Sequence, residues 1–179
     1  MKTIVAFAGS DSKTSINKQL ATYAASLVKD VEVNILDLND YDLPLYGIDR
    51  EQEHGIPEDA HKFLKTMQAA DGIVLSLAEH NGVYATVFKN LFDWMSRIDG
   101  KLWADIPMLL MATSPGVRGG GTVLDIAVGR FPFMGGNIVG AFSLPSFNDN
   151  FKSGKIVDET LQEKLEEEVK KLQEAIHKA

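Results

Sequence analysis

The fold is indicated by one stretch near the N-terminus, residues 4–17, which read IVAFAGSDSKTSIN. An apolar run leads into a loop rich in hydroxyl side chains, and Ile16 opens a segment with apolar residues at helical spacing. A helix that starts after such a loop attracts anions, because its first N–H groups are free and its dipole is positive there. The stretch therefore predicts a phosphate-bearing ligand, with hydroxyl donors from Ser10, Ser12, Thr14 and Ser15.

This loop matches neither of two familiar phosphate-binding patterns. A dinucleotide-binding turn needs three glycines as G-x-G-x-x-G, and only Gly9 is present. Lys13 and Thr14 resemble the end of a P-loop, but the glycine that should precede them is missing. A solvated loop that merely caps the helix remains an alternative, since serine and threonine are favoured there without any ligand.

Along the rest of the chain, apolar runs alternate with helical periods. The runs predict five strands, at residues 2–8, 31–36, 72–77, 106–112 and 137–144. Residues 37–55 are expected to form a long irregular connection. The alternation predicts an α/β fold: a flavodoxin-like three-layer sandwich with a five-stranded parallel sheet of order 2-1-3-4-5 and helices on both faces. One domain is expected to span residues 1–179.

Composition excludes several classes of function. The chain carries a net charge of -7 without a basic cluster, which argues against binding to nucleic acid or to an anionic membrane surface. It has no cysteine, so thiolate catalysis and iron–sulfur clusters are excluded. The N-terminus does not resemble a signal peptide, and no apolar run approaches the length of a membrane span. A cytoplasmic location is expected.

Two further loops follow strands that should end at the ligand crevice. Residues 78–84 contain Glu79 and His80, both possible acid–base groups, before the turn signal Asn81-Gly82. No metal is expected at His80, because no second ligand stands at suitable spacing. Residues 113–121 contain four glycines, which would allow close approach of a flat ligand, or would simply form a flexible turn. With so few reactive side chains, the ligand itself is expected to carry the chemistry.

Three motifs in order resemble those of the NAD(P)H-dependent FMN reductase family, flavodoxin-like enzymes that include quinone, azo-dye and chromate reductases. The family pattern G-S-x-R-x-x-S-x-N-x-x-L corresponds here to GSDSKTSINKQL, residues 9–20. The pattern P-E-Y-N-G, followed by K-N-x-x-D-W, corresponds to AEHNG at 78–82 and KNLFDW at 89–94. The pattern S-P-G-x-x-G-G corresponds to SPGVRGG at 114–120.

The resemblance implies bound FMN, with NAD(P)H as co-substrate and a homodimer or homotetramer as the assembly. The FMN-binding residues that it implies are Ser10, Ser12, Lys13, Ser15, Ile16, Asn17, Glu79, His80, Asn81, Gly82, Ser114, Gly119 and Gly120. Ser12 stands where the family has arginine, so Lys13 is the residue that would have to supply the missing charge. Trp94 of the second motif is expected to be structural or interfacial rather than catalytic.

These observations predict an FMN-dependent oxidoreductase that takes hydride from NAD(P)H and passes it to a flavin, quinone, azo or similar small-molecule acceptor by ping-pong chemistry. No catalytic side chain is assigned, although His80 is a candidate proton donor to the acceptor. Two alternatives remain: an electron carrier of the flavodoxin type without a nicotinamide substrate, and a degenerate binding protein without flavin.

Overall fold

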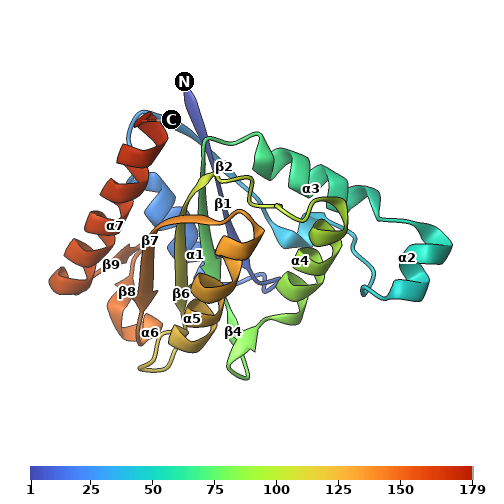
Figure 1. The fold of residues 1–179 in the computed structure, drawn as a ribbon. Coiled ribbons are helices and arrows are strands. Elements are labelled where there is room, and N and C mark those ends of the chain that lie inside the picture. Colours follow the sequence, from blue (N-terminus) through green and yellow to red (C-terminus); the bar gives the residue numbers. More distant parts are fainter. Residues whose placement is uncertain (179) are drawn as a thin grey trace.

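The computed structural model describes residues 1–178, and a five-stranded parallel sheet forms its centre (Figure 1). The strand order β2-β1-β3-β6-β7 is the predicted 2-1-3-4-5 order, because β4 and β5 form a separate pair. The strands of the sheet are β1 (Lys2–Gly9), β2 (Val31–Ile35), β3 (Gly72–Leu77), β6 (Pro107–Thr113) and β7 (Asn137–Leu144). The predicted α/β, flavodoxin-like architecture is therefore confirmed.

Helices cover both faces of this sheet, as Figure 1 shows. One face carries α1 (Ile16–Ser26) and α7 (Glu159–Lys178), and the other carries α3 (Glu58–Gln68), α4 (Thr86–Ile98) and α5 (Gly121–Arg130). No helix among residues 1–178 has both the length and the apolar character that a membrane crossing requires.

The central strands are apolar throughout because both of their faces are buried. In β1, Ile4 and Ala6 pack in the layer that holds α1 and α7, whereas Val5 and Phe7 pack in the layer of α3, α4 and α5. Each fully buried side chain of this size stabilises the fold by about 1.5–3 kcal/mol relative to an exposed one. Burial on two faces thus explains why the strand runs do not alternate with polar residues.

The prediction of an irregular connection over residues 37–55 is wrong in part. This segment contains the short helix η1 (Leu38–Asp40) and α2 (Ile48–His54), which projects beyond α3 and α4 in Figure 1. Long-range contacts order the segment: Asn90 Nδ2 donates to the carbonyl oxygens of Leu43 and Pro44, at 3.1 Å each. Trp94 Nε1 also donates to the Pro44 carbonyl, at 2.7 Å. Trp94 was predicted to be structural or interfacial, and its complete burial within one chain fits a structural role.

Several short elements had no sequence prediction. They are the pair β4 (Glu79–His80) and β5 (Val83–Tyr84), η2 (Phe131–Met134), α6 (Phe147–Asn150), and the pair β8 (Phe151–Lys152) and β9 (Lys155–Ile156). Each contains four residues or fewer, which is too short for hydrophobic periodicity to identify it. Both strand pairs border cavities: β4 and β5 lie at the carboxyl end of the sheet, and β8 and β9 lie beside α1.

An aromatic cluster joins β5 to α4. The ring of Tyr84 lies 5.3 Å from that of Phe88 and 6.1 Å from that of Phe92. The Tyr84 hydroxyl is buried and has no hydrogen-bond partner among residues 1–178. This burial raises the pKa of Tyr84 to about 12, and the nearby charge of Arg130 offsets only part of the shift.

Replacement of Tyr84 with phenylalanine should therefore stabilise the protein, by about 1 kcal/mol, because it removes a buried donor that lacks a partner. Because the pKa of Tyr84 is raised in the folded state, its ionisation leaves the free energy of unfolding unchanged below pH 10 and lowers it as the pH rises toward about 12. Urea unfolding of the wild type and of Tyr84→Phe across this range measures both effects. If the free energy of unfolding of Tyr84→Phe falls above pH 10 as steeply as that of the wild type, the fall does not come from Tyr84.

Candidate functional site

The carboxyl ends of β1, β3 and β6 meet at one edge of the sheet, where the strand order reverses. A cavity of about 220 Å³ lies there between the three loops that the sequence singled out. Its lining residues are Ser10, Ser12, Thr14, Ser15, Ile16, Asn17, Ala78, Glu79, His80, Thr113, Ser114 and Pro115. The structure thus brings the predicted loops together at the switch point, where ligands of such sheets bind.

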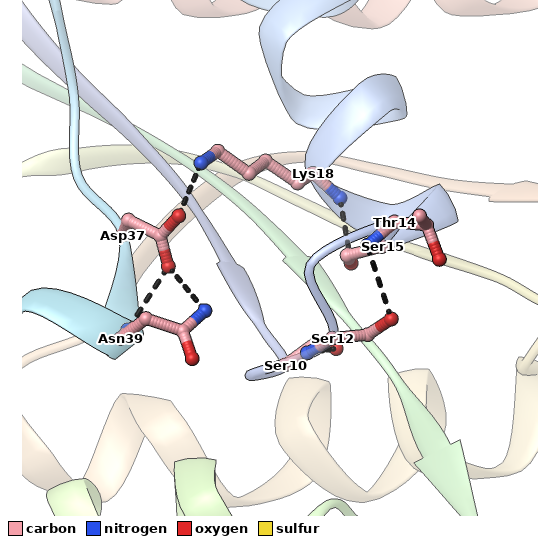
Figure 2. Close-up of polar contacts among 7 residues, drawn as sticks. All are labelled: Ser10, Ser12, Thr14, Ser15, Lys18, Asp37 and Asn39. Carbon is pink, nitrogen blue, oxygen red and sulfur yellow. Dashed lines mark hydrogen bonds and ion pairs between the residues drawn. The ribbon is translucent and has the colours of Figure 1, made fainter.

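Hydroxyl groups organise the first loop by accepting hydrogen bonds from its own backbone. Ser10 Oγ accepts from Ser12 N at 3.2 Å, and Ser12 Oγ accepts from Thr14 N at 3.3 Å. Ser15 is the N-cap of α1, and its Oγ accepts from Lys18 N at 3.1 Å (Figure 2). A hydroxyl that accepts in this way keeps its own proton for donation. Three O–H donors are therefore available to an anion at the cavity.

The start of α1 supplies two further donors. Within residues 1–178, the backbone N–H groups of Ile16 and Asn17 have no hydrogen-bond acceptor, and both residues line the cavity. The first N–H groups of a helix cannot be satisfied inside the helix, and they carry the positive end of its dipole. Together with the serine hydroxyls, these groups form a site whose chemistry fits a phosphate.

Asn17 connects the start of α1 to the ends of β3 and β6 beneath the cavity. Its side chain is almost completely buried, and its Oδ1 accepts from Ser76 Oγ at 2.7 Å and from Thr113 N at 3.0 Å. Its Nδ2 donates to the Thr113 carbonyl at 3.1 Å. The side chain therefore holds the loops in register, and the backbone N–H of Asn17 remains for a ligand.

The lysines near the loop point away from this cavity. Figure 2 shows Lys18 extended to Asp37, with which it forms an ion pair, while Asp37 also accepts from the backbone and side chain of Asn39. Burial raises the pKa of Asp37, but the hydrogen bonds from Lys18 and Asn39 outweigh that effect, so the net pKa is lowered. Lys13 is exposed and lines the groove on the outer side of α1 instead.

The second loop is a hairpin rather than an open turn. Asn81 and Gly82 both have positive φ angles, 53° and 80°, which form the tight connection between β4 and β5. Glu79 Oε2 accepts from Val123 N in the first turn of α5, at 2.9 Å, so this carboxylate ties the hairpin to that helix. His80 lies on the exposed side of the hairpin and lines the cavity.

The glycine-rich third loop turns sharply into α5. Gly119 and Gly120 have φ angles of 55° and 74°, and Gly120 is the N-cap of the helix. Ser143 Oγ donates to the Gly119 carbonyl at 2.9 Å, which fixes the loop against β7. Arg118 is exposed, and no carboxylate among residues 1–178 lies within ion-pair distance of it.

Most of the predicted site residues therefore lie at the cavity, but not all of them. Lys13, Asn81, Gly82, Gly119 and Gly120 do not line it. The lining also includes Thr14, which was predicted as a hydroxyl donor, and three residues that were not predicted, namely Ala78, Thr113 and Pro115. Ala78 directly follows β3, Thr113 ends β6 and Pro115 lies two residues further on, so their position at the strand ends was the signal that could have identified them.

A doubly wound parallel sheet with this strand order, and with a hydroxyl-lined helix start at its switch point, defines a nucleotide-binding protein of the flavodoxin-like class. The site offers O–H and N–H donors for a phosphate at one end. At the other end, a hairpin and a glycine-rich turn flank the carboxyl ends of β3 and β6. Such a site suits a ligand that has a phosphate on one side and a ring system on the other.

Comparison with known proteins identifies the family. Residues 2–149 match the model of the NADPH-dependent FMN reductases. A quinone reductase of Escherichia coli K12 is 33% identical over 147 residues, which is 75% of this chain and 78% of that relative. A 2-hydroxy-1,4-benzoquinone reductase of a Burkholderia species is 36% identical over 118 residues, which is 65% of this chain and 62% of that relative.

A solved structure agrees with these matches. FerB of Paracoccus denitrificans, a flavoenzyme NAD(P)H:(acceptor) oxidoreductase, has a TM-score of 0.77 and 25% identity, and the match covers 99% of this chain and 98% of FerB. The chain belongs to the NADPH-dependent FMN reductase family. The predicted class of enzyme, a flavin-dependent oxidoreductase with FMN as cofactor and NAD(P)H as co-substrate, is therefore confirmed.

Proposed function

We propose that this protein reduces quinones and related small aromatic acceptors, with FMN held in the cavity at the ends of β1, β3 and β6. The observation that supports this most strongly is the set of donors around one cavity. The O–H groups of Ser10, Ser12 and Ser15 and the free N–H groups of Ile16 and Asn17 surround the place where a phosphate would lie.

The remaining candidate residues would border the flavin ring. Ser114 and His80 lie on opposite loops of the same cavity, and the hairpin turn Asn81-Gly82 and the Gly119-Gly120 turn flank it. Bound FMN would supply the redox chemistry by accepting hydride from NAD(P)H and passing it on to the acceptor. The chain's part is to orient the ring and leave one face open, and His80 is placed to hold a proton for the acceptor.

The acceptor class rests on the relatives. Both curated relatives described above are named as quinone reductases, and one of them carries the name of a specific hydroxylated benzoquinone. An exposed site with few charged lining groups suits a neutral aromatic acceptor. A homodimer or homotetramer, a single domain over residues 1–179 and a cytoplasmic location are parts of the same proposal.

Steady-state kinetics of the FMN-loaded protein test the acceptor class. With NADPH or NADH as donor and 1,4-benzoquinone as acceptor, we expect turnover with parallel double-reciprocal lines, because both substrates use one site in turn. Ferricyanide serves as a one-electron acceptor for comparison. If ferricyanide is reduced but no quinone is, the acceptor assignment is wrong while the flavin assignment stands.

Lys13 is expected to add a modest, salt-dependent contribution to FMN affinity. It is exposed, so its attraction to the phosphate is screened by solvent and salt. Lys13→Ala should raise the Kd for FMN by no more than about tenfold, or about 1.4 kcal/mol, at low ionic strength. Fluorescence titration at two salt concentrations measures this effect.

Lys29→Ala, which removes an exposed lysine three residues beyond the end of α1, is the matched control. Equal affinities for the two variants would show that Lys13 does not replace the family arginine.

A further inference from the structure

A second cavity adjoins the phosphate site on the outer side of α1. It has a volume of about 490 Å³ and lies between this helix and the β8–β9 hairpin. Along α1 it is lined by Lys18, Gln19, Thr22, Tyr23 and Ser26, and the hairpin contributes Phe151 and Gly154. We call this cavity the α1 groove.

The α1 groove lies next to the phosphate site. Thr14 and Ser15 line both cavities, so the residues before α1 stand between them. A phosphate on the free N–H groups of Ile16 and Asn17 would therefore lie close to the α1 groove as well as to the ring site.

One unpaired cation lines the α1 groove. Lys13 lines it without a carboxylate within ion-pair distance among residues 1–178. Lys18 lines it as well but forms an ion pair with Asp37. In a chain with a net charge of -7, an unpaired lysine at this groove favours an anionic ligand.

The walls of the α1 groove suit a nucleoside. Tyr23 and Phe151 pack edge to face at 5.7 Å and provide an aromatic floor. Gln19, Thr22 and Ser26 are exposed and line the same cavity with amide and hydroxyl groups. An amide side chain matches the hydrogen-bonding edge of adenine, and hydroxyl groups match those of a ribose.

We propose that the α1 groove receives the adenylate half of FAD, so that the site accepts the dinucleotide flavin as well as FMN. The proposal rests on the proposed flavin site and extends it. The phosphate of FMN is a monoester with a charge of nearly -2, whereas each phosphate of FAD carries about one negative charge, since its second ionisation is absent. A phosphate loop with Ser12 in place of arginine, and with Lys13 turned toward the groove, fits the lower charge density of the diphosphate.

A steric block in the α1 groove should distinguish the binding of FAD from the binding of FMN. Thr22→Trp fills the groove from an exposed position on α1 without touching the cavity that holds the FMN phosphate. The full-length protein, stripped of flavin, is titrated with FAD and with FMN, and binding is followed by flavin fluorescence. Thr160→Trp on the exposed first turn of α7 is the matched control.

We expect the wild type and Thr160→Trp to bind both flavins with Kd values within about tenfold of each other, or about 1.4 kcal/mol. Thr22→Trp should raise the Kd for FAD by at least about tenfold and leave the Kd for FMN unchanged. Binding of FMN without FAD by the wild type overturns this inference and leaves the proposed function intact. Failure to bind either flavin overturns both. If Thr22→Trp raises only the KM for NADPH of the FMN-loaded enzyme, the groove serves the nicotinamide nucleotide, and the FAD assignment is wrong.

Discussion

Replacing Asn17 with leucine is expected to cost about 2–5 kcal/mol of stability and to abolish measurable FMN binding. Leucine has the same number and branching of side-chain heavy atoms as asparagine, but it leaves the Ser76 hydroxyl and the Thr113 N–H buried without partners. The same substitution releases the start of α1 from β3 and β6, so the donors for the phosphate lose their common geometry. Urea unfolding and FMN titration measure the two effects.

Asn90→Leu is the control that separates stability from site geometry. Asn90 also makes three hydrogen bonds, to Leu43, Pro44 and Tyr46, but it makes them at the connection before α2. This variant should lose stability and keep the FMN affinity of the wild type. If Asn17→Leu binds FMN as well as Asn90→Leu does, the side chain of Asn17 does not organise the site.

The second large effect is expected at Gly119. A Cβ atom there would lie 2.5 Å from Ser143 Oγ and 2.7 Å from the Leu144 carbonyl oxygen, and the φ angle of 55° is unfavourable for any residue with a side chain. Strain of about 1–2 kcal/mol from the left-handed backbone adds to overpacking against β7 of about 1–3 kcal/mol. Gly119→Ala should therefore lose roughly 3 kcal/mol of stability in a urea unfolding experiment.

Gly121→Ala provides a matched control two residues further along. Nothing lies within 4 Å of a Cβ atom at Gly121, which is the first residue of α5 and has no positive φ angle. Alanine favours a helix over glycine by up to about 1 kcal/mol, so this variant should be as stable as the wild type or more stable. If Gly119→Ala and Gly121→Ala lose the same stability, the loss does not come from the close approach of the Cβ atom to β7.

The sequence was sufficient for the sheet and for the location of the candidate cavity. Buried parallel strands are continuous apolar runs, so β1, β3 and β6 could be found without any alignment. The switch point then predicted that the ligand lies beside the loops that follow those strands, and the structure has a cavity there. Both arguments depend only on local patterns and on the way parallel strands end at one edge.

The sequence could not predict features that depend on partners far along the chain. Asn17 interacts with Ser76 and Thr113, which are 59 and 96 residues away. Likewise, α2 lies in a segment whose composition indicates a loop, and contacts from Asn90 and Trp94 hold the chain just before it. The sequence also could not show that Lys18 forms an ion pair with Asp37 and is therefore not free to meet a phosphate. Such choices follow from tertiary geometry rather than from spacing.

The central claim, a flavin site that is reduced by a nicotinamide nucleotide, is tested most directly by anaerobic reduction of the FMN-loaded protein. We expect NADPH or NADH to abolish the visible absorbance band of the bound flavin rapidly and without added acceptor, and subsequent addition of 1,4-benzoquinone to restore it. A protein that binds no FMN, or one whose bound FMN stays oxidised with both nucleotides, would contradict the account.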